Sequence, residues 1–207
     1  MTDITVRPYK IEDFDELLEI QKEAFPPPFP EDLLWNRAQI AAHTEAFPAG
    51  AMIAEVDGEA AGSATSLIIR YNGKKHTWDD VADEGYIRGS HKPGGDTLYG
   101  IDLCVRPKFR GTGVAKALYE ARKQLVKSYG LKRYIAGSRI PGYHKYADEL
   151  TAEEYVEKVK NGELNDEVLT FMLLQGLEIK HVLADYLDDE ESCHYGVIVE
   201  WQNPEFS

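Results

Sequence analysis

Apolar positions recur along the chain with two periods, one typical of strands and one typical of helices. The alternating pattern and short apolar runs predict strands over residues 4–7, 51–56, 60–70, 98–105, 133–138, 177–183 and 195–201. The longer period predicts helices over residues 11–25, 30–43, 114–129, 151–162 and 166–175. Helices interleaved with strands in this order are typical of an α/β (α+β) domain.

Turn-forming residues set several of these boundaries. Asp57-Gly58 between two apolar runs is typical of a hairpin turn. Thr151, followed three residues later by Glu154, is typical of a helix start. The proline-rich segment 25–30 cannot continue a helix, because proline has no backbone N–H. Pro30 occupies a favoured first-turn position, so we expect the second helix to begin there.

Two segments depart from the periodic pattern. Residues 71–96 are rich in Gly, Lys and Asp, and we expect a long surface connection with a short helix near 78–82. Residues 141–165 are expected to form a second insertion. No internal repeat or low-complexity tract is visible. At roughly 150 residues per domain, residues 1–207 are expected to form a single domain.

The overall charge is strongly acidic. The chain has 36 Asp and Glu against 23 Lys and Arg, for a formal charge of −13. Nucleic acids and anionic membranes are polyanions, so neither is expected as a partner. An amine or another cationic ligand is compatible with this charge.

The composition also limits metal, disulfide and membrane chemistry. Cys104 and Cys193 have unrelated spacing, and the six histidines form no metal-like pair, so neither a disulfide scaffold nor a metal site is expected. Residues 1–7 have no apolar signal core, and the apolar stretch Val168–Leu174 is too short to cross a bilayer. We therefore expect a cytoplasmic protein.

The basic residues are concentrated around one glycine turn. Residues 103–133 hold nine Lys or Arg and one acid, while the rest of the chain is strongly acidic. A solvated basic face would explain such a run, but here it surrounds a glycine turn that opens a helix. Backbone N–H groups at a helix start, together with cations, form an anion site.

Two common phosphate motifs fit this turn poorly. A Walker A loop requires Gly-Lys-Ser/Thr, whereas Gly113 is followed by Val114-Ala115-Lys116. The dinucleotide fingerprint requires a small residue at position 116 and a first glycine nearer the strand. NAD binding therefore stays a weaker hypothesis.

The segment Arg110-Gly111-Thr112-Gly113-Val114-Ala115, between a strand and a helix, resembles the acyl-CoA motif of the GNAT N-acyltransferase superfamily. The order of elements agrees over nearly the whole chain. This resemblance implies a central mixed, mostly antiparallel sheet flanked by helices. Residues 47–50, 98–102 and 142–155 are similar to a branch whose acyltransferase domain is sometimes fused to a carbon-nitrogen hydrolase. Since the sequence ends at Ser207, we expect the free-standing form.

The resemblance implies transfer of an acetyl group from acetyl-CoA to a primary amine by direct attack. The acceptor would be a small-molecule amine or a protein amino group, and members of this superfamily frequently form homodimers. The residues implied in acetyl-CoA binding are Leu103, Cys104, Val105, Arg110, Gly111, Thr112, Gly113, Val114, Ala115 and Asn165.

The catalytic groups are less well defined by the resemblance. Asp102, beside the acetyl-binding strand end, is the candidate base. The family often has Asn, then Tyr seven residues later, then Gly; Asn165 and Gly176 match, but position 172 is Met, which cannot donate a proton. Other candidate donors are Tyr143, Tyr146, His144 and Tyr195, of which we take Tyr143. The alternative is a catalytically weak or inactive acyl-CoA-binding module that regulates a partner protein.

Overall fold

The computed structural model of the protein describes residues 3–206. Its strands are β1 (Ile4–Pro8), β2 (Ala51–Val56), β3 (Glu59–Ile69), β4 (Thr97–Val105), β5 (Arg133–Ser138), β6 (Glu178–Leu183) and β7 (Gly196–Gln202). Its α-helices are α1 (Phe14–Ala24), α2 (Arg37–Ala46), α3 (Trp78–Ala82), α4 (Val114–Ser128), α5 (Ala152–Lys160) and α6 (Leu169–Leu174).

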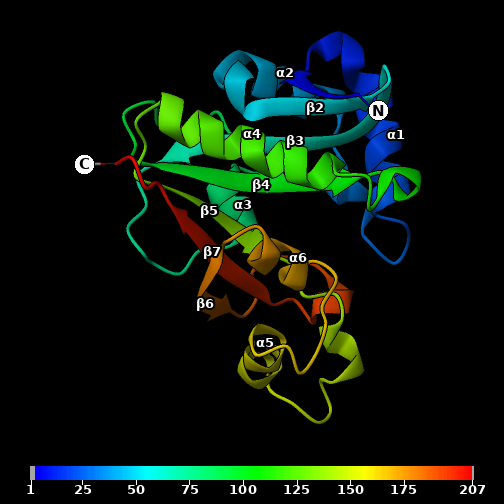
Figure 1. Ribbon diagram of the computed structural model, residues 1–207, viewed down its shortest axis with the longest axis vertical. Coiled ribbons are helices and arrows are strands. Elements are labelled where there is room, and N and C mark those ends of the chain that lie inside the picture. Colours follow the sequence, from blue (N-terminus) through cyan, green and yellow to red (C-terminus); the bar gives the residue numbers. More distant parts are fainter. Residues whose placement is uncertain (1–2, 207) are drawn as a thin grey trace.

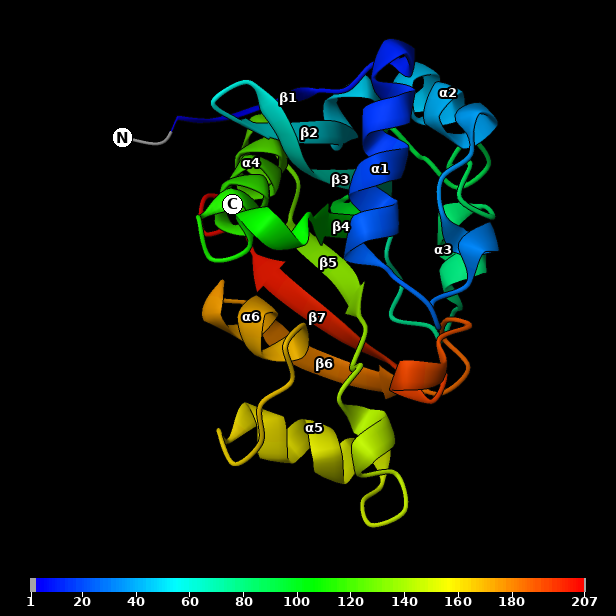
Figure 2. The ribbon, with the colours of Figure 1, turned by 90° about the vertical axis from the view of Figure 1, so that its right-hand side faces the viewer.

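The strands form one seven-stranded sheet in the order β1-β2-β3-β4-β5-β7-β6. Strands β4 and β5 run parallel, and the other neighbouring pairs are antiparallel. Helices α1, α2 and α3 cover one face of the sheet, while α4 and α6 cover the other (Figures 1 and 2). The expected mixed, mostly antiparallel sheet flanked by helices is thereby confirmed.

Local signals account for most of the elements. The Asp57-Gly58 turn joins β2 to β3, and both turn residues have positive φ angles, of 50° and 85°. Thr151 caps α5. Its hydroxyl oxygen accepts from the backbone N–H of Glu154, and the Glu154 carboxylate accepts from the backbone N–H of Thr151. Helix α4 buries Leu118 and Val126 against the sheet, which stabilises it by burial of one apolar stripe.

The expected start of the second helix at Pro30 is wrong. Residues 31–33 form a single 3-10 turn, and α2 begins at Arg37. The reason is a capping box: the Asn36 side chain accepts from the N–H of Gln39, and the Gln39 side chain accepts from the N–H of Asn36. The segment between α1 and α2 is therefore a loop.

The helix expected from residue 166 begins at Leu169, and the side chain of Asp166 binds the turn that leads into it. Its buried Oδ1 accepts from the backbone N–H groups of Val168 and Leu169 at 3.1 and 3.0 Å. Its Oδ2 accepts from the N–H of Gly142 at 3.0 Å and from the hydroxyl of Tyr155 at 2.9 Å. One carboxylate thus joins the start of α6 to the segment that carries α5.

Candidate active site

Strands β4 and β5 are paired at one end and separate at the other. Their ladder covers Thr97–Gly100 of β4 and Arg133–Ala136 of β5. Beyond these residues, β4 continues beside β3 as far as Val105, and β5 continues beside β7. A gap therefore opens in the middle of the sheet, at the carboxyl ends of its two parallel strands.

Main-chain groups of β4 point into this gap. The N–H of Arg106 donates to the carbonyl oxygen of Ala61 on β3, at 2.9 Å. Bonded and non-bonded pairs alternate in an antiparallel ladder, so Leu103 and Val105 direct their N–H and C=O groups away from β3. These groups can bind an extended ligand in the gap.

Strand β4 has a β-bulge at the point where it separates from β5. Thr65 of β3 opposes Asp102, whereas Ser66 opposes Gly100, so Ile101 is the additional residue of β4. Buried Arg122 of α4 donates to the carbonyl oxygens of Thr65, at 2.8 Å, and of Asp102. These bonds hold the bulge from the α4 side of the sheet.

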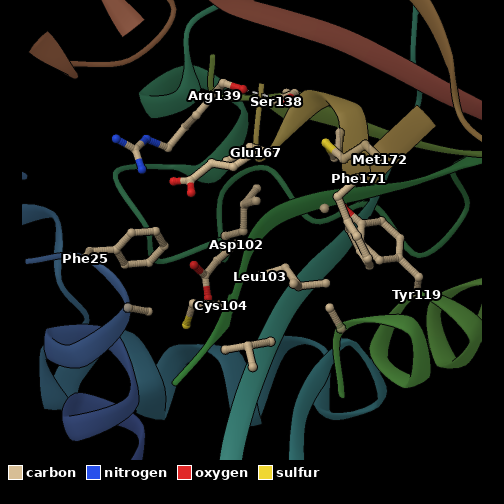
Figure 3. A pocket seen from close by; sticks show the side chains of 18 of the residues that line it. Phe25, Asp102, Leu103, Cys104, Tyr119, Ser138, Arg139, Glu167, Phe171 and Met172 are labelled. Atoms are coloured by element: carbon tan, nitrogen blue, oxygen red, sulfur yellow. Dashed lines mark hydrogen bonds between the residues drawn. The ribbon is translucent and has the colours of Figure 1, made fainter. Parts of the chain in front are cut away.

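The gap is part of a cavity of about 590 Å³ (Figure 3). Both faces of the sheet contribute to its wall, together with the loop between α1 and α2 and the segment between β6 and β7. Eight of the twelve predicted site residues line it: Asp102, Leu103, Cys104, Val105, Arg110, Gly111, Gly113 and Ala115.

The glycine turn forms one end of this cavity. Gly111 and Gly113 have φ angles of 76° and 103°, which glycine adopts without strain. A Cβ at Gly111 would meet nothing within 4 Å, so the turn is open to a ligand. Helix α4 starts at Val114, and its first N–H groups have no partner within the helix. The turn therefore presents donors and a positive helix end.

The basic residues around the turn divide into two groups. Arg106 is paired with Glu23, with Nη2 and Oε1 2.6 Å apart, and Lys108 is paired with Glu59. Arg110 and Lys116 instead line the cavity. Of the four cations within residues 106–116, two are thus neutralised by acids and two face the cavity.

The side chain of Asp102 lies in the cavity wall (Figure 3), and Asp102 follows the bulge in β4. Burial raises the pKa of this carboxyl to about 6, and the positive charge of Arg122 partly opposes that shift. Among residues 3–206, its Oδ2 has no hydrogen-bond partner, and neither has the buried Nε1–H of Trp35, which also lines the cavity. The Trp35 and Gln21 side chains nonetheless lie close enough to this carboxyl to oppose the rise of its pKa.

Cys104 lines the cavity as a buried thiol. Its Sγ lies 3.4 Å from the hydroxyl oxygen of Ser63. Burial raises the pKa of this thiol well above its usual range, with Asp102 adding to the shift. Cys104 therefore stays protonated and is a poor nucleophile.

Four of the predicted site residues are not among those that line the cavity. Val114 is buried and the side chain of Thr112 donates to the carbonyl oxygen of Phe109 at 2.7 Å. Asn165 is exposed on the segment before α6. The Tyr143 hydroxyl donates to the carbonyl oxygen of Leu150 at 3.0 Å, which gives no support to a catalytic role.

Met172 of α6 does line the cavity, and its side chain faces it in Figure 3. Sequence reasoning missed other wall residues, because they come from distant segments without a common motif. Among them are Phe25, Phe29, Trp35, Trp78, Tyr119, Arg122, Ser138, Arg139, Glu167, Phe171, Tyr186 and Leu187. The one sequence signal for any of these residues is the position of Ser138 and Arg139 at the end of β5, the strand that runs parallel to the motif strand β4.

Two kinds of feature are absent from residues 3–206. No group of three or more His, Cys, Asp or Glu side chains is placed to hold a metal ion. No helix in this range combines the length and the apolar character needed to cross a membrane.

The family of the chain follows from comparison with known proteins. The family model described as acetyltransferase (GNAT) family matches residues 14–144. A Bacillus subtilis (strain 168) protein named uncharacterized N-acetyltransferase YkwB is 43% identical over 97% of this chain and 89% of its own length. The chain belongs to the GNAT acetyltransferase family, whose activity is acyl transfer.

A second relative from the same organism, named probable hydrolase YhcX, is 41% identical over 98% of this chain. The chain spans 39% of the length of that protein. The sequence resembles a branch in which the acyltransferase domain is sometimes fused to a second domain, and that branch predicts a longer relative of this kind.

Solved structures agree on the fold. The loading GNATL domain of CurA from Lyngbya majuscula has a TM-score of 0.82 at 22% identity, covering 97% of this chain and 98% of that one. The GNAT-like decarboxylase GphF, in complex with isobutyryl-CoA, has a TM-score of 0.77 at 23% identity, covering 96% and 99%. At these identities the likeness concerns the fold.

Proposed function

We propose that the protein transfers an acyl group, in the first place acetyl, from acyl-CoA to a primary amine. The observation that carries this proposal is one cavity that runs from an open glycine turn, past the gap between β4 and β5, to the carboxyl group of Asp102. An anion site, an extended main-chain site and a buried acid are the three features that this reaction requires.

The residues present fit an acyl-CoA. The diphosphate would bind the N–H groups of Gly111 and of residues 113–115, with Arg110 and Lys116 beside it; the N–H of Thr112 donates to the carbonyl oxygen of Phe109. The pantetheine arm would lie along the main chain of Leu103 and Val105. A backbone N–H of β4 would bind the thioester oxygen and stabilise the negative charge that develops there in the transition state. In support, GphF, a structural neighbour, binds isobutyryl-CoA.

The opposite end of the cavity suits a cationic acceptor. Arg139 lines this end, but it is paired with Asp189 (Nε to Oδ2, 2.7 Å) and with Glu191 (Nη2 to Oε2, 2.9 Å). The acids that face the cavity are Asp102 and Glu167. An ammonium group entering here would meet the carboxylates of Glu167 and Asp102; Arg139 is held by its own partners, and Arg122 compensates the charge of Asp102 only in part.

The reaction then proceeds by direct attack. Asp102 takes one proton from the ammonium group, and the neutral amine attacks the thioester carbon. The C–N bond forms, the C–S bond breaks with its electron pair on sulfur, and Asp102 returns its proton to the sulfur of CoA. This use of Asp102 does not need a tyrosine at position 172, where the chain has Met.

Calorimetry combined with a thiol assay tests the proposal. The purified protein is titrated with acetyl-CoA, and CoA release is then measured with a panel of mono-, di- and polyamines and a peptide with a free amino terminus. We expect binding together with amine-dependent release. Binding without release on any amine would contradict catalysis and favour a regulatory acyl-CoA-binding module.

A further inference from the structure

Three side chains outside the glycine turn form a hydrogen-bonded row from the cavity toward the protein surface. Tyr186, between β6 and β7, lines the cavity. Its hydroxyl oxygen lies 3.0 Å from that of Tyr99 on β4, and Tyr99 Oη lies 2.8 Å from Nε2 of His76. Both tyrosines are buried, whereas His76 is half-buried in the segment 71–96. The row therefore runs from the cavity wall to a side chain that solvent can reach.

The hydrogen positions in this row follow from its outer end. Nδ1 of His76 lies 3.0 Å from the carbonyl oxygen of Lys74, which can only accept. A neutral His76 therefore carries its hydrogen on Nδ1 and accepts at Nε2. Tyr99 then donates to His76, and Tyr186 donates to Tyr99. The Tyr186 oxygen keeps its lone pairs for a donor in the cavity, so the row is oriented to move a proton outward.

The surroundings hold the tyrosines in place. A Cβ at Gly137 of β5 would overlap the hydroxyl of Tyr186, and one at Gly196 of β7 would overlap its ring. Tyr186 therefore lies flat on the two strands where they lack side chains. The rings of Tyr99 and Tyr186 meet the His76 imidazole edge-on, with centroids 5.5 and 6.0 Å apart.

The proton balance of the proposed reaction requires that a proton leave the cavity. An ammonium acceptor loses two protons when it becomes an amide, and the sulfur of CoA gains one when the C–S bond breaks. Asp102 can carry one proton from nitrogen to sulfur. The other proton must leave the cavity in each turnover.

We propose that Tyr186, Tyr99 and His76 form a relay that carries this other proton to solvent, an inference that rests on acyl transfer to an amine. As the adduct loses its N–H bond, the electron pair stays on nitrogen and the proton goes to Oη of Tyr186. Tyr186 passes its own proton to Tyr99, and Tyr99 passes its proton to Nε2 of His76. The imidazolium then releases a proton to solvent.

The relay works by concerted transfer, since neither tyrosine needs to ionise alone. Burial raises the pKa of Tyr99 well above its usual range, with Tyr186 adding to the shift. Burial likewise raises the pKa of Tyr186. Both hydroxyls therefore remain protonated between turnovers. The row is reset when the two hydroxyls rotate back and His76 exchanges its Nε2 hydrogen for one on Nδ1 through solvent.

The first test measures kcat for amine acylation in three variants, His76→Ala, Tyr99→Phe and Tyr186→Phe. Each is expected to lower kcat by about 10-fold or more, within the range of a lost proton-transfer group. The KM for acetyl-CoA should not change. Matched controls are Tyr71→Phe, whose ring packs edge-on against His76 with centroids 6.2 Å apart, and His181→Ala, on the exposed side of β6. Both controls should keep the wild-type kcat.

Imidazole rescue separates a relay from a structural role. Because His76 is half-buried, imidazole in the buffer can reach the space that His76→Ala leaves. It should restore kcat in that variant, and not in Tyr99→Phe or Tyr186→Phe, which interrupt the row nearer the cavity. Wild-type kcat in His76→Ala, or equal acceleration of all three variants by imidazole, would overturn the relay.

A nuclear magnetic resonance readout keeps the relay testable without turnover. Nitrogen shifts of His76 should report the Nδ1–H tautomer, and binding of CoA in the cavity should change them in the wild type but not in Tyr99→Phe. If no amine is acylated and these shifts still respond, the proposed acceptor chemistry fails and the proton path stands. If amines are acylated and the shifts respond equally in both proteins, the relay fails and the proposed function stands.

Discussion

The indole Nε1–H of Trp78 donates a 2.8 Å hydrogen bond to the carbonyl oxygen of Ile101, the residue that the bulge adds to β4. Arg122 bonds to the neighbouring carbonyl of Asp102 from the α4 side of the sheet. The bulge is thus held from both faces. Its consequence is functional, because it places Asp102 in the wall of the cavity at the point where β4 leaves β5.

Replacing Asp102 by asparagine tests its proposed role as base. Asp102→Asn should lower kcat by about 10²–10⁴-fold, because an amide of the same shape cannot accept the proton. In the wild type, kcat/KM should fall below about pH 6, since burial raises the pKa of Asp102 to about 6 and its protonated form is inactive. Rates measured from pH 5 to 8 check this. If Asp102→Asn shows the same fall of kcat/KM below about pH 6, Asp102 is not the base.

The glycine turn can be tested by binding alone. Gly113→Glu introduces a carboxylate and a side chain at a φ of 103°, and we expect it to abolish acetyl-CoA binding in calorimetry. Gly162→Glu is the matched control: its φ is 76°, and it lies after α5. A Cβ there would meet nothing within 4 Å, and one at Gly113 would be in ordinary contact with Ile4 Cδ1 at 3.4 Å. The control should bind like the wild type, and equal loss in both variants would show that charge and strain act nonspecifically.

His43 should make stability depend on pH. Burial lowers its pKa to about 4, while Tyr9 lies 2.8 Å from Nδ1 and the carbonyl of Gly85 lies 2.6 Å from Nε2. The unfolded state binds a proton at a higher pH than the folded state. The free energy of unfolding therefore falls as pH drops from about 6.5 through about 4, by about 3 kcal/mol.

Urea unfolding from pH 7 to 4 measures this effect, with His43→Gln as the comparison. Both proteins retain Asp102, whose raised pKa makes stability change in the opposite direction between about pH 4 and 6. The difference between the two proteins therefore isolates His43. Parallel curves for wild type and variant would refute the prediction.

Much of the fold could be predicted from local signals, because strands and helices are read from short-range periodicity. Helix α3 begins and ends at the residues expected, Trp78 and Ala82. Pro30 does not start α2, although its position favours a helix start, because the capping box at Asn36 determines where this helix begins. The glycine turn is a contiguous motif and was found in the same way.

The far wall of the cavity could not be predicted in this manner. Trp35, Trp78, Arg139 and Tyr186 belong to four separate segments and meet only once the sheet is assembled. Residues 71–96 were interpreted as a surface connection, yet this segment supplies Trp78 to the cavity and His76 to the proposed relay. Convergence of this kind depends on long-range packing, which no local pattern encodes.

Tyr143→Phe tests the donor taken from sequence reasoning. Because the Tyr143 hydroxyl donates to the carbonyl of Leu150 and does not line the cavity, the variant should keep the wild-type kcat. It should lose about 1 kcal/mol of unfolding free energy with the hydrogen bond. Steady-state rates and urea unfolding measure the two effects, and a large loss of kcat without destabilisation would restore a catalytic role.

The most direct test of acyl transfer is product identification by mass spectrometry. Wild type, Gly113→Glu and Gly162→Glu are incubated with acetyl-CoA and the amine panel, and acetylated amines are measured together with free CoA. The account predicts one acetylated amine per CoA released by the wild type and by Gly162→Glu, and neither product from Gly113→Glu. Equal CoA release by wild type and Gly113→Glu, or release without any acetylated amine, would contradict it.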